Sequence, residues 1–588
     1  MILGEFKMAR RIPLASSLAL LIPAAAIEAQ PLIEDYVPVP DAVLQDPDPA
    51  DWLMWRRTLN NWGYSPLDDI DTRNVGGLQL VWTQELAPGD QEGTPLVYDG
   101  VMYFPNPNDI TRAYDAATGD LIWEYRRGVP ADVGDYFPAA PTNRNLAIHG
   151  NHILDNGADG WAYAIDATTG ELAWETHILD YRAGAKNSSG PIVANGKVIS
   201  GRSCEPEGGP EACVITAFDA ETGEELWRTR TIPRPGEPGD ETWGGVPYEE
   251  RWHVGMWMVP SFDAELNRIY VGTSVTAPAP KFILGGNDEQ YLYHNSTLAL
   301  DGDTGEIVWY FQHVVDHWDL DHPFERLLVD TVVAPNPDEV DWINPRLRDG
   351  EERKVITGIP GKTGLVYTID RETGEFLWAR ETIHQNVIAS INTESGAATV
   401  DPSKMFTRVG QELLVCPAQT GGKNYPAGTY SPLSGVMYYP LQNTCMTVTS
   451  TADEQSIESL YAINMRTQLA PGVDDVGTLQ AINVETGELE WKLEQPAAML
   501  SVISTGGELL FAGDVEGRFR AYDQNNGDVL WEVNLGSPVN GYPATFEVAG
   551  RQYVAVSTGG SGLVFGLATL ADIRPGSGNR LYVFALPE

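Results

Sequence analysis

A short acidic segment, Asp316-His-Trp-Asp-Leu-Asp-His322, carries the residues best suited to chemistry in this chain. Asp319 and Asp321 form an Asp-x-Asp pair, and a carboxylate held in a fixed place can accept a proton or bind a hard cation. The competing interpretation is a solvated acidic loop, which is natural in a chain with 82 acidic residues. Residue types alone favour the solvated loop, so any chemical role depends on the elements that position the segment.

The chain has four cysteines, an even number that fits export to an oxidising compartment. By proximity the pairs are Cys204 with Cys213 and Cys416 with Cys445. The alternative is four free buried thiols.

A nine-residue pattern, usually D-x-x-T-G-E-x-x-W, occurs seven times and identifies the elements. Each copy follows a short apolar run and precedes a β-rich run, so it predicts a strand, a tight turn and a second strand. A repeated hairpin cannot bury both faces alone, and the recurring Trp can fill the gap between neighbouring sheets. We therefore predict an all-β fold, a β-propeller with tryptophan-docking motifs. The copies are Asp115–Trp123, Asp166–Trp174, Asp219–Trp227, Asp301–Trp309, Asp370–Trp378, Asn483–Trp491 and Asp523–Trp531.

The spacing of the motifs predicts eight blades. A four-stranded blade takes roughly 40–50 residues, so the long gap between Trp378 and Trp491 has room for a blade without a motif. Val436–Pro440 and Cys445–Val448 are its expected strands, and Leu78–Trp82 is expected to close the ring with the last blade. Seven blades with a long insertion remain the alternative.

The ends and the composition indicate one exported domain. Residues 1–29 have a basic start, an apolar run and small residues for cleavage, as in a signal peptide, and residues 30–588 read as a single propeller domain. The apolar run is too short and too rich in small residues for a membrane span. The net charge of −44 excludes nucleic acid and an acidic membrane surface as partners, whereas it fits a basic protein partner or a salty habitat.

Ordered motifs give the chain a family resemblance. Trp62-Gly-Tyr-Ser-Pro-Leu67, Glu92-Gly-Thr-Pro-Leu-Val97 and Tyr553-Val-Ala-Val-Ser557 frame nearly all of the expected mature chain. With the seven repeats, the chain resembles pyrroloquinoline-quinone (PQQ) dependent alcohol dehydrogenases, which are eight-bladed periplasmic quinoproteins. The resemblance implies oxidation of an alcohol by hydride transfer to PQQ. Because no C-x-x-C-H occurs, it is nearest to the haem-free methanol and ethanol enzymes, which pass electrons to a separate acceptor such as soluble cytochrome c.

The resemblance also assigns a PQQ pocket on the propeller axis. An arginine at position 144 suits a PQQ carboxylate, since a tricarboxylate needs forked cationic donors, and Trp257 is expected to stack on the quinone. Taken singly, a solvated charge for Lys362 and blade packing for Trp257 are the competing interpretations. The implied cofactor residues are Glu92, Arg144, Ser188, Trp257, Lys362 and Asn424.

The implied catalytic base is Asp319, which in the family also binds a metal. Asp321 matches a second Asp that accompanies lanthanide in some branches, so calcium is expected first and lanthanide is the alternative. The family's acidic metal ligand aligns best with Glu205, and Glu207 is the alternative. The family's Asn ligand is absent, and Thr276 or Ser274 could replace its oxygen.

Further similarities to the family and departures from it bear on function. Pro138-Ala139 stands where many relatives have a vicinal disulfide, while Cys416 and Cys445 match a cysteine pair of the family. Long insertions at Pro233–Arg251 and Thr382–Lys404 favour a bulky or secondary alcohol, such as a polyol or a toxin hydroxyl. The rival functions are a non-catalytic assembly propeller, which predicts a lipobox Cys, and a membrane-bound sugar dehydrogenase, which predicts N-terminal spans.

Overall fold

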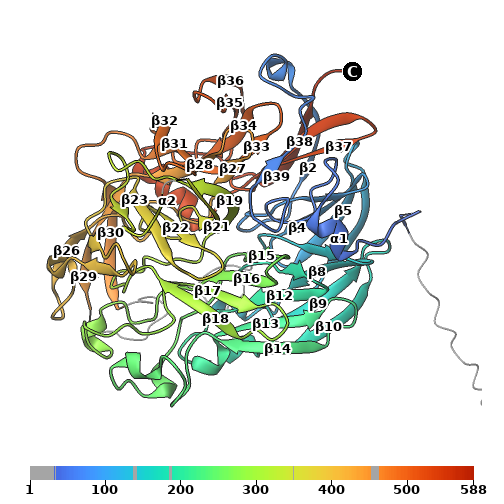
Figure 1. Cartoon of the computed structure of the whole chain (residues 1–588). Coiled ribbons are helices and arrows are strands. Elements are labelled where there is room, and N and C mark those ends of the chain that lie inside the picture. Colours follow the sequence, from blue (N-terminus) through green and yellow to red (C-terminus); the bar gives the residue numbers. More distant parts are fainter. Residues whose placement is uncertain (1–31, 34, 137–141, 184–187, 349, 452–461) are drawn as a thin grey trace, which may run out of the picture.

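Eight four-stranded antiparallel sheets surround a common axis in the computed structural model of the chain (Figure 1). The structure describes residues 32–588 apart from 34, 137–141, 184–187, 349 and 452–461. We number the sheets as blades 1 to 8 in chain order. The predicted eight-bladed propeller is confirmed.

The first four blades run from residue 96 to residue 312, each built from consecutive strands. Blade 1 contains β3 (Leu96–Tyr98), β4 (Val101–Asn106), β5 (Ile110–Asp115) and β6 (Leu121–Arg126), and blade 2 contains β7 (Ala147–His149), β8 (His152–Asn156), β9 (Trp161–Asp166) and β10 (Leu172–His177). Blade 3 contains β11 (Ile192–Ala194), β12 (Lys197–Gly201), β13 (Val214–Asp219) and β14 (Glu225–Arg230), and blade 4 contains β15 (Ser261–Asp263), β16 (Arg268–Gly272), β17 (Ser296–Asp301) and β18 (Ile307–Gln312).

The last four blades include two extra edge strands, β20 (Trp342–Ile343) on blade 5 and β1 (Tyr64–Ser65) on blade 7. Blade 5 contains β19 (Leu327–Val333), β21 (Glu351–Thr357), β22 (Leu365–Asp370) and β23 (Phe376–Glu381), and blade 6 contains β27 (Thr429–Ser431), β28 (Val436–Gln442), β31 (Gly477–Asn483) and β32 (Leu489–Gln495). Blade 7 contains β33 (Met499–Thr505), β34 (Leu509–Asp514), β35 (Arg518–Asp523) and β36 (Val529–Asn534), and blade 8 contains β37 (Ala544–Val548), β38 (Arg551–Thr558), β39 (Arg580–Ala585) and β2 (Gln79–Glu85).

The position of the blade without a motif differs from the prediction. It is blade 8, in which β2 from the start of the chain pairs with β39, as expected for Leu78–Trp82. The long gap instead holds part of blade 6 and an insertion. The insertion contains the pair β24 (Ile388–Ile391) and β25 (Ala398–Val400), and the sheet β26 (Glu412–Val415), β29 (Thr444–Ser450) and β30 (Ile463–Leu469). Val436–Pro440 therefore belongs to blade 6, and Cys445–Val448 belongs to this accessory sheet.

The tryptophan motifs join neighbouring blades. The Trp82 ring lies over Gly119 of blade 1, where an added Cβ would come within 2.6 Å of the ring, and Gly119 has φ +79°. Glycine is needed there both for the positive φ and for the close approach. Indole Nε1 atoms donate to backbone oxygens of the next blade in five pairs: Trp82 to Ala116, Trp123 to Ala167, Trp174 to Ala220, Trp227 to Gly302 and Trp491 to Gln524.

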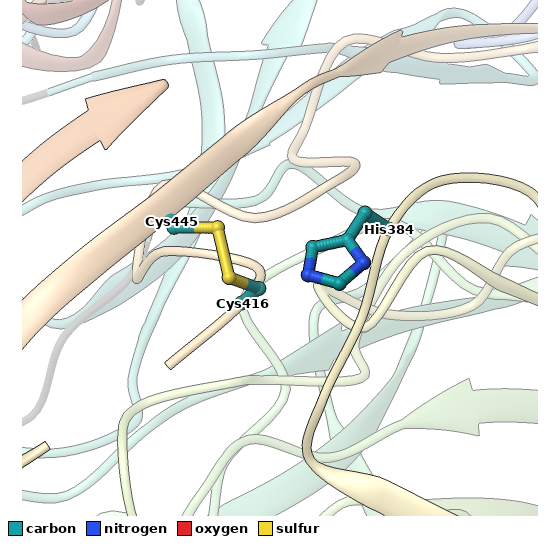
Figure 2. A group of neighbouring side chains, drawn as sticks. All are labelled: His384, Cys416 and Cys445. Atoms are coloured by element: carbon teal, nitrogen blue, oxygen red, sulfur yellow. A yellow bond between two sulfur atoms is a disulfide. The ribbon is translucent and has the colours of Figure 1, made fainter. Parts of the chain in front are cut away.

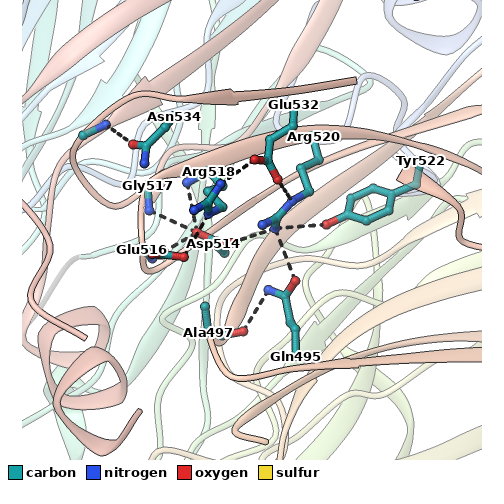
Figure 3. A network of polar contacts seen from close by, with 11 residues as sticks. Gln495, Ala497, Asp514, Glu516, Gly517, Arg518, Arg520, Tyr522, Glu532 and Asn534 are labelled. Carbon is teal, nitrogen blue, oxygen red and sulfur yellow. Dashed lines mark hydrogen bonds and ion pairs between the residues drawn. The ribbon is translucent and has the colours of Figure 1, made fainter. Parts of the chain in front are cut away.

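Polar contacts reinforce the ring at blade 7. Asp514 is buried at the end of β34, and its Oδ1 accepts the N–H groups of Glu516, Gly517 and Arg518 (Figure 3). Its Oδ2 lies 2.8 Å from a guanidinium nitrogen of Arg520, which in turn contacts Gln495 of blade 6. The carboxylate thus fixes the turn between β34 and β35 and supports a contact between two blades.

The N-terminal segment 52–65 fills the centre of the ring. Its backbone bonds to inner strands of blades 1, 4, 5 and 6, and β1 pairs with β33 of blade 7. Arg56 is fully buried there and donates to the carbonyl oxygens of Gly428 and Val502. Among the described residues, two α-helices complete the fold, α1 (Asp41–Gln45) and α2 (Gly562–Leu570). In the described part of the chain, no helix is long and apolar enough to cross a membrane.

Candidate functional site

The implied site residues lie in the loops at one end of the ring. Inner strands begin at this end, and the second strands finish there, so loops from different blades meet around the axis. Six residues precede inner strands, and three stand between later strands of their blades. The six are Glu92, Arg144, Ser188, Trp257, Asp319 and Asn424, and the three are Glu205, Thr276 and Lys362.

Arg144 connects the loops of blades 1, 2, 3 and 4. A guanidinium nitrogen lies 2.8 Å from a carboxylate oxygen of Glu92, and both side chains are buried. Another nitrogen donates to the Ser188 carbonyl oxygen at 2.7 Å. The guanidinium carbon is 5.3 Å from the centre of the Trp257 ring, a cation–π distance. Burial raises the pKa of Glu92, and the Arg144 charge opposes this effect.

A second group joins Trp257 to the acidic segment. The Trp257 Nε1 donates to Asp321 Oδ2 at 3.2 Å, and the Val275 N–H donates to Oδ1 of the same carboxylate at 2.7 Å. The Lys362 ammonium is 3.0 Å from Asp319 Oδ1 and 3.4 Å from Asp321 Oδ2. The acidic segment is therefore buried and paired, and the solvated-loop interpretation is wrong.

Asp319 sits in an unusual environment. It is 1 % exposed and has φ +68°, a left-handed conformation that a non-glycine residue seldom adopts. Burial raises the pKa of Asp319 well above its usual value, although the Lys362 charge acts in the opposite direction. Burial also disfavours ionised Asp321, but the Lys362 charge and the Val275 N–H outweigh it, so the pKa of Asp321 is lowered. One carboxyl is thus biased toward holding a proton and its neighbour toward remaining ionised.

Glu205 and Thr276 stand on either side of the segment 252–257. Glu205 is 2 % exposed, whereas Glu207 is exposed to solvent, which favours Glu205 as the inward-facing acid. Cys204 Sγ accepts the His253 N–H at 3.3 Å, and the Thr276 hydroxyl donates to the Trp252 carbonyl oxygen at 2.9 Å. Ser274 is bonded in the same way, since its hydroxyl donates to the His253 carbonyl oxygen and accepts the Gly255 N–H.

Asn424 is linked to Arg144 through its neighbour Tyr425. Its side-chain oxygen accepts the Tyr425 N–H, and its amide nitrogen donates to the Thr420 carbonyl oxygen. The Tyr425 ring faces Arg144, with 5.2 Å between ring centre and guanidinium carbon, and its hydroxyl contacts Asn540 and Ser561. The predicted residues therefore form two groups that Trp257 joins, since its carbonyl oxygen accepts from Arg144 and Ser188 and its Nε1 donates to Asp321. Glu205, Thr276 and Asn424 are attached through neighbours.

Two buried residues beside the acidic segment were not predicted. Asp316 accepts the N–H groups of Trp318 and Leu320, and Lys281 lies under the loop that begins at Thr276. The Asp-x-x-Asp spacing of Asp316 and Asp319 is a local signal of the first, because Asp side chains often bond backbone groups two residues ahead. Lys281 lies 35 residues upstream of Asp316, and no motif marks it.

Both predicted disulfides are present. Cys204–Cys213 closes the loop that carries Glu205, and Cys416–Cys445 joins the segment after β26 to β29. In the described residues, the only three His, Cys, Asp or Glu side chains whose ligand atoms gather within 4.8 Å of one another are His384, Cys416 and Cys445 (Figure 2). Because the two sulfurs are bonded to each other, they are not thiolate ligands. Residues 1–29 and Pro138-Ala139 lie outside the described residues.

The donor set fits a polyanionic, aromatic cofactor. Arg144 Nε and Ser189 Oγ are buried without hydrogen-bond partners, and the partly exposed Trp257 ring offers a flat face beside them. Buried polar atoms normally find partners, so these donors suit the carboxylates and ring oxygens of a bound group. Carboxylates such as those of Glu205, Asp319 and Asp321 are ligands that a hard cation takes, but the ligand atoms of these three do not gather within 4.8 Å of one another.

Comparison with known proteins identifies the family. The sequence profile described as "PQQ: Glucose/ethanol/alcohol dehydrogenase, beta-propeller domain" matches residues 52–386 and 456–554. The chain belongs to this family of PQQ-dependent alcohol dehydrogenases, oxidoreductases that act on CH–OH groups.

Relatives within the family include both haem-containing and other quinoproteins. The chain is 31 % identical to the dehydrogenase subunit of alcohol dehydrogenase (quinone) from Komagataeibacter europaeus, over 88 % of this chain and 72 % of the relative. It is 28 % identical to quinoprotein alcohol dehydrogenase PedH of Pseudomonas putida, over 93 % of each chain.

Two solved structures share the fold. Quinohemoprotein alcohol dehydrogenase ADHIIG from Pseudomonas putida superposes with a TM-score of 0.82 at 28 % identity, covering 95 % of this chain and 82 % of the other. A europium-containing methanol dehydrogenase gives 0.83 at 25 % identity, covering 93 % and 100 %.

Proposed function

We propose that this enzyme oxidises its alcohol with Asp319 as the general base. The observation that carries the proposal is the buried Asp319 carboxylate, held by Lys362 in the same loop cluster as Arg144 and Trp257. A base must be held within reach of the proton that it takes. A buried, conformationally fixed carboxylate at the end of the propeller axis meets that need.

The cofactor residues divide by chemistry. Arg144 offers an unpaired Nε for a PQQ carboxylate, and Trp257 offers a ring face for stacking. Glu92, Ser188 and Asn424 supply polar edges, and Lys362 supplies a cation beside the base. PQQ, when bound, accepts the hydride that leaves the carbinol carbon, while Asp319 takes the hydroxyl proton.

We assign the metal to Glu205 and Asp319, with Asp321 and Thr276 as further oxygen ligands. Burial of Glu205 and the exposure of Glu207 support this choice. Oxygen ligands of this kind suit Ca²⁺. Asp321 adds a third carboxylate, and the likeness to a europium-containing methanol dehydrogenase supports a lanthanide as the alternative ion.

The remaining assignments concern the surroundings of the enzyme. We propose export to the periplasm with loss of residues 1–29, and a mature domain of residues 30–588. The insertions 233–251 and 382–404 favour a bulky or secondary alcohol over methanol. The net charge of −44 favours a basic electron acceptor such as a soluble cytochrome c, because opposite charges speed association.

Reconstitution of purified protein tests the proposal. PQQ is added with Ca²⁺ or La³⁺, and alcohol-dependent dye reduction is measured for methanol, ethanol, 2-butanol and a polyol. The proposal predicts activity that requires both PQQ and a metal, with higher kcat/KM for the larger alcohols. Activity without PQQ would refute the cofactor assignment, and a strong preference for methanol would refute the substrate assignment.

A further inference from the structure

The base loop is held by a buried carboxylate that belongs to neither the cofactor group nor the metal group. Asp316 is fully buried, and its two oxygens accept the N–H groups of Trp318 at 2.7 Å and Leu320 at 2.5 Å. These amides flank Asp319 on both sides. The Asp316 N–H itself donates to His294 Nε2 at 3.2 Å, so the supporting residue is anchored in blade 4.

The conformation of Asp319 needs such support. Its φ of +68° is left-handed, and a non-glycine residue keeps such a conformation only where neighbouring contacts fix it. The two hydrogen bonds to Asp316 fix the peptide group between residues 317 and 318 and the one between Asp319 and Leu320. Without them, the backbone would be free to relax, and the Asp319 carboxylate would leave its place beside Lys362.

Lys281 provides the nearby positive charge. Its side chain is fully buried, and its nitrogen donates to the carbonyl oxygens of Thr276, Pro278 and Ala279 at 2.9, 2.9 and 3.1 Å. The three acceptors favour the ammonium form, which alone has three N–H donors, whereas burial lowers the pKa of Lys281 to about 7. The same ammonium acts electrostatically on the Asp316 carboxylate.

We propose that Asp316 and Lys281 are two positioning residues of the active site. Asp316 holds the loop of Asp319, and Lys281 holds the loop of Thr276. Both act through the backbone of these loops. The inference rests on the proposed role of Asp319 as base.

The chain offers a matched control for Asp316. Asp370 is equally buried in blade 5, accepts the N–H groups of Glu372 and Thr373, and pairs with Arg353. It ends β22, a six-residue strand that begins next to Lys362, so it lies at the far end of the blade, roughly 20 Å away. Asp370→Asn therefore neutralises a similarly buried capping carboxylate, and removes its ion pair with Arg353, without reaching the site.

The first experiment compares Asp316→Asn with Asp370→Asn in enzyme reconstituted with PQQ and metal. Asp316→Asn should lower kcat by about 10- to 100-fold, since small displacements of a reacting group have effects of this size. KM and bound PQQ should stay within threefold or so of wild type, while EGTA should strip the metal roughly tenfold faster. Asp370→Asn should lower the unfolding temperature but leave kcat within about twofold. Equal kcat for Asp316→Asn and wild type would overturn the inference.

The second experiment remains decisive even if Asp316→Asn fails to fold. Lys281→Ala leaves three carbonyl oxygens converging on a vacated ammonium position, so added NH₄⁺ should restore kcat and slow the loss of metal to EGTA. Tetramethylammonium, which is too large and has no N–H, should restore neither. No response to NH₄⁺, or equal rescue by tetramethylammonium, would overturn the role of Lys281. An active Asp319→Asn enzyme would instead refute the proposed base. The NH₄⁺ experiment would still decide whether Lys281 holds the loop of Thr276.

Discussion

The Lys362 ammonium lies 3.0 Å from Oδ1 of Asp319, and both side chains are almost completely buried. Removing one partner of a buried ion pair leaves an uncompensated charge, which typically costs 3–5 kcal/mol. The pairing therefore decides whether the proposed base can be ionised when the alcohol binds.

Lys362→Met is expected to lower kcat by about 100-fold or more. Without the cation, the pKa of Asp319 rises further, so the base stays protonated and the acid limb of the kcat–pH profile moves to higher pH. Lys362→Arg keeps the charge and should retain most of the activity. The two profiles are compared at saturating alcohol and PQQ, and an unshifted acid limb in Lys362→Met would contradict the coupling.

Asp321 should distinguish the two candidate ions. Asp321→Asn keeps an oxygen acceptor for Val275 but removes one negative charge, which a trivalent ion needs more than Ca²⁺ does. We expect the La³⁺-dependent activity to fall at least tenfold more than the Ca²⁺-dependent activity. Equal losses with the two ions would show that Asp321 serves only to hold the loop.

Glu205 and Glu207 offer a paired test of the metal ligand. Glu205→Gln should weaken restoration of activity when metal is titrated into chelator-treated enzyme, because the buried acid is the inward-facing one. Glu207→Gln, at an exposed position, should leave the titration unchanged. The reverse result would move the ligand to Glu207.

The stability of the propeller should fall as pH rises, and Asp109 should contribute to this fall. Burial raises its pKa from 3.8 to about 7, so the folded protein retains a proton that the unfolded chain has lost. Its stabilising contribution is complete below about pH 4 and disappears as pH rises through about 7.

Asp109→Asn keeps an acceptor for the Ala158 N–H and cannot ionise. The difference between the urea midpoints at pH 5 and pH 8 should therefore shrink, whereas the exposed Asp120→Asn should keep the wild-type difference. An unchanged difference in Asp109→Asn would show that this carboxyl does not titrate in the window.

Local chemistry explains which parts of the fold were predictable. In each motif the Asp or Asn caps the turn, the Gly takes positive φ and the Trp packs on the next blade, as in Asp115, Gly119 and Trp123. These interactions are encoded within nine residues, so the repeat predicts the ring. Blade 8 lacks the motif and joins both ends of the chain through β2 and β39, whereas the spacing of the motifs placed the motif-free blade in the gap after Trp378.

The site was predictable in its positions but not in its contacts. Family motifs gave Arg144, Trp257, Asp319 and Lys362, and the structure brings these into two bonded groups. The other contacts of the site depend on the burial together of residues that are far apart in the sequence. Lys281 is buried under the loop of Thr276, and no motif in the sequence marks it.

The most direct test of the account is turnover by Asp319→Asn enzyme that holds PQQ and metal in the wild-type amounts. If Asp319 takes the alcohol proton, kcat should fall by about 10²- to 10⁴-fold, the usual scale for loss of a general base. Bound PQQ, measured by its absorbance, should be unchanged, since Arg144 and Trp257 remain in place. A kcat close to that of wild type in this loaded variant would contradict the assignment.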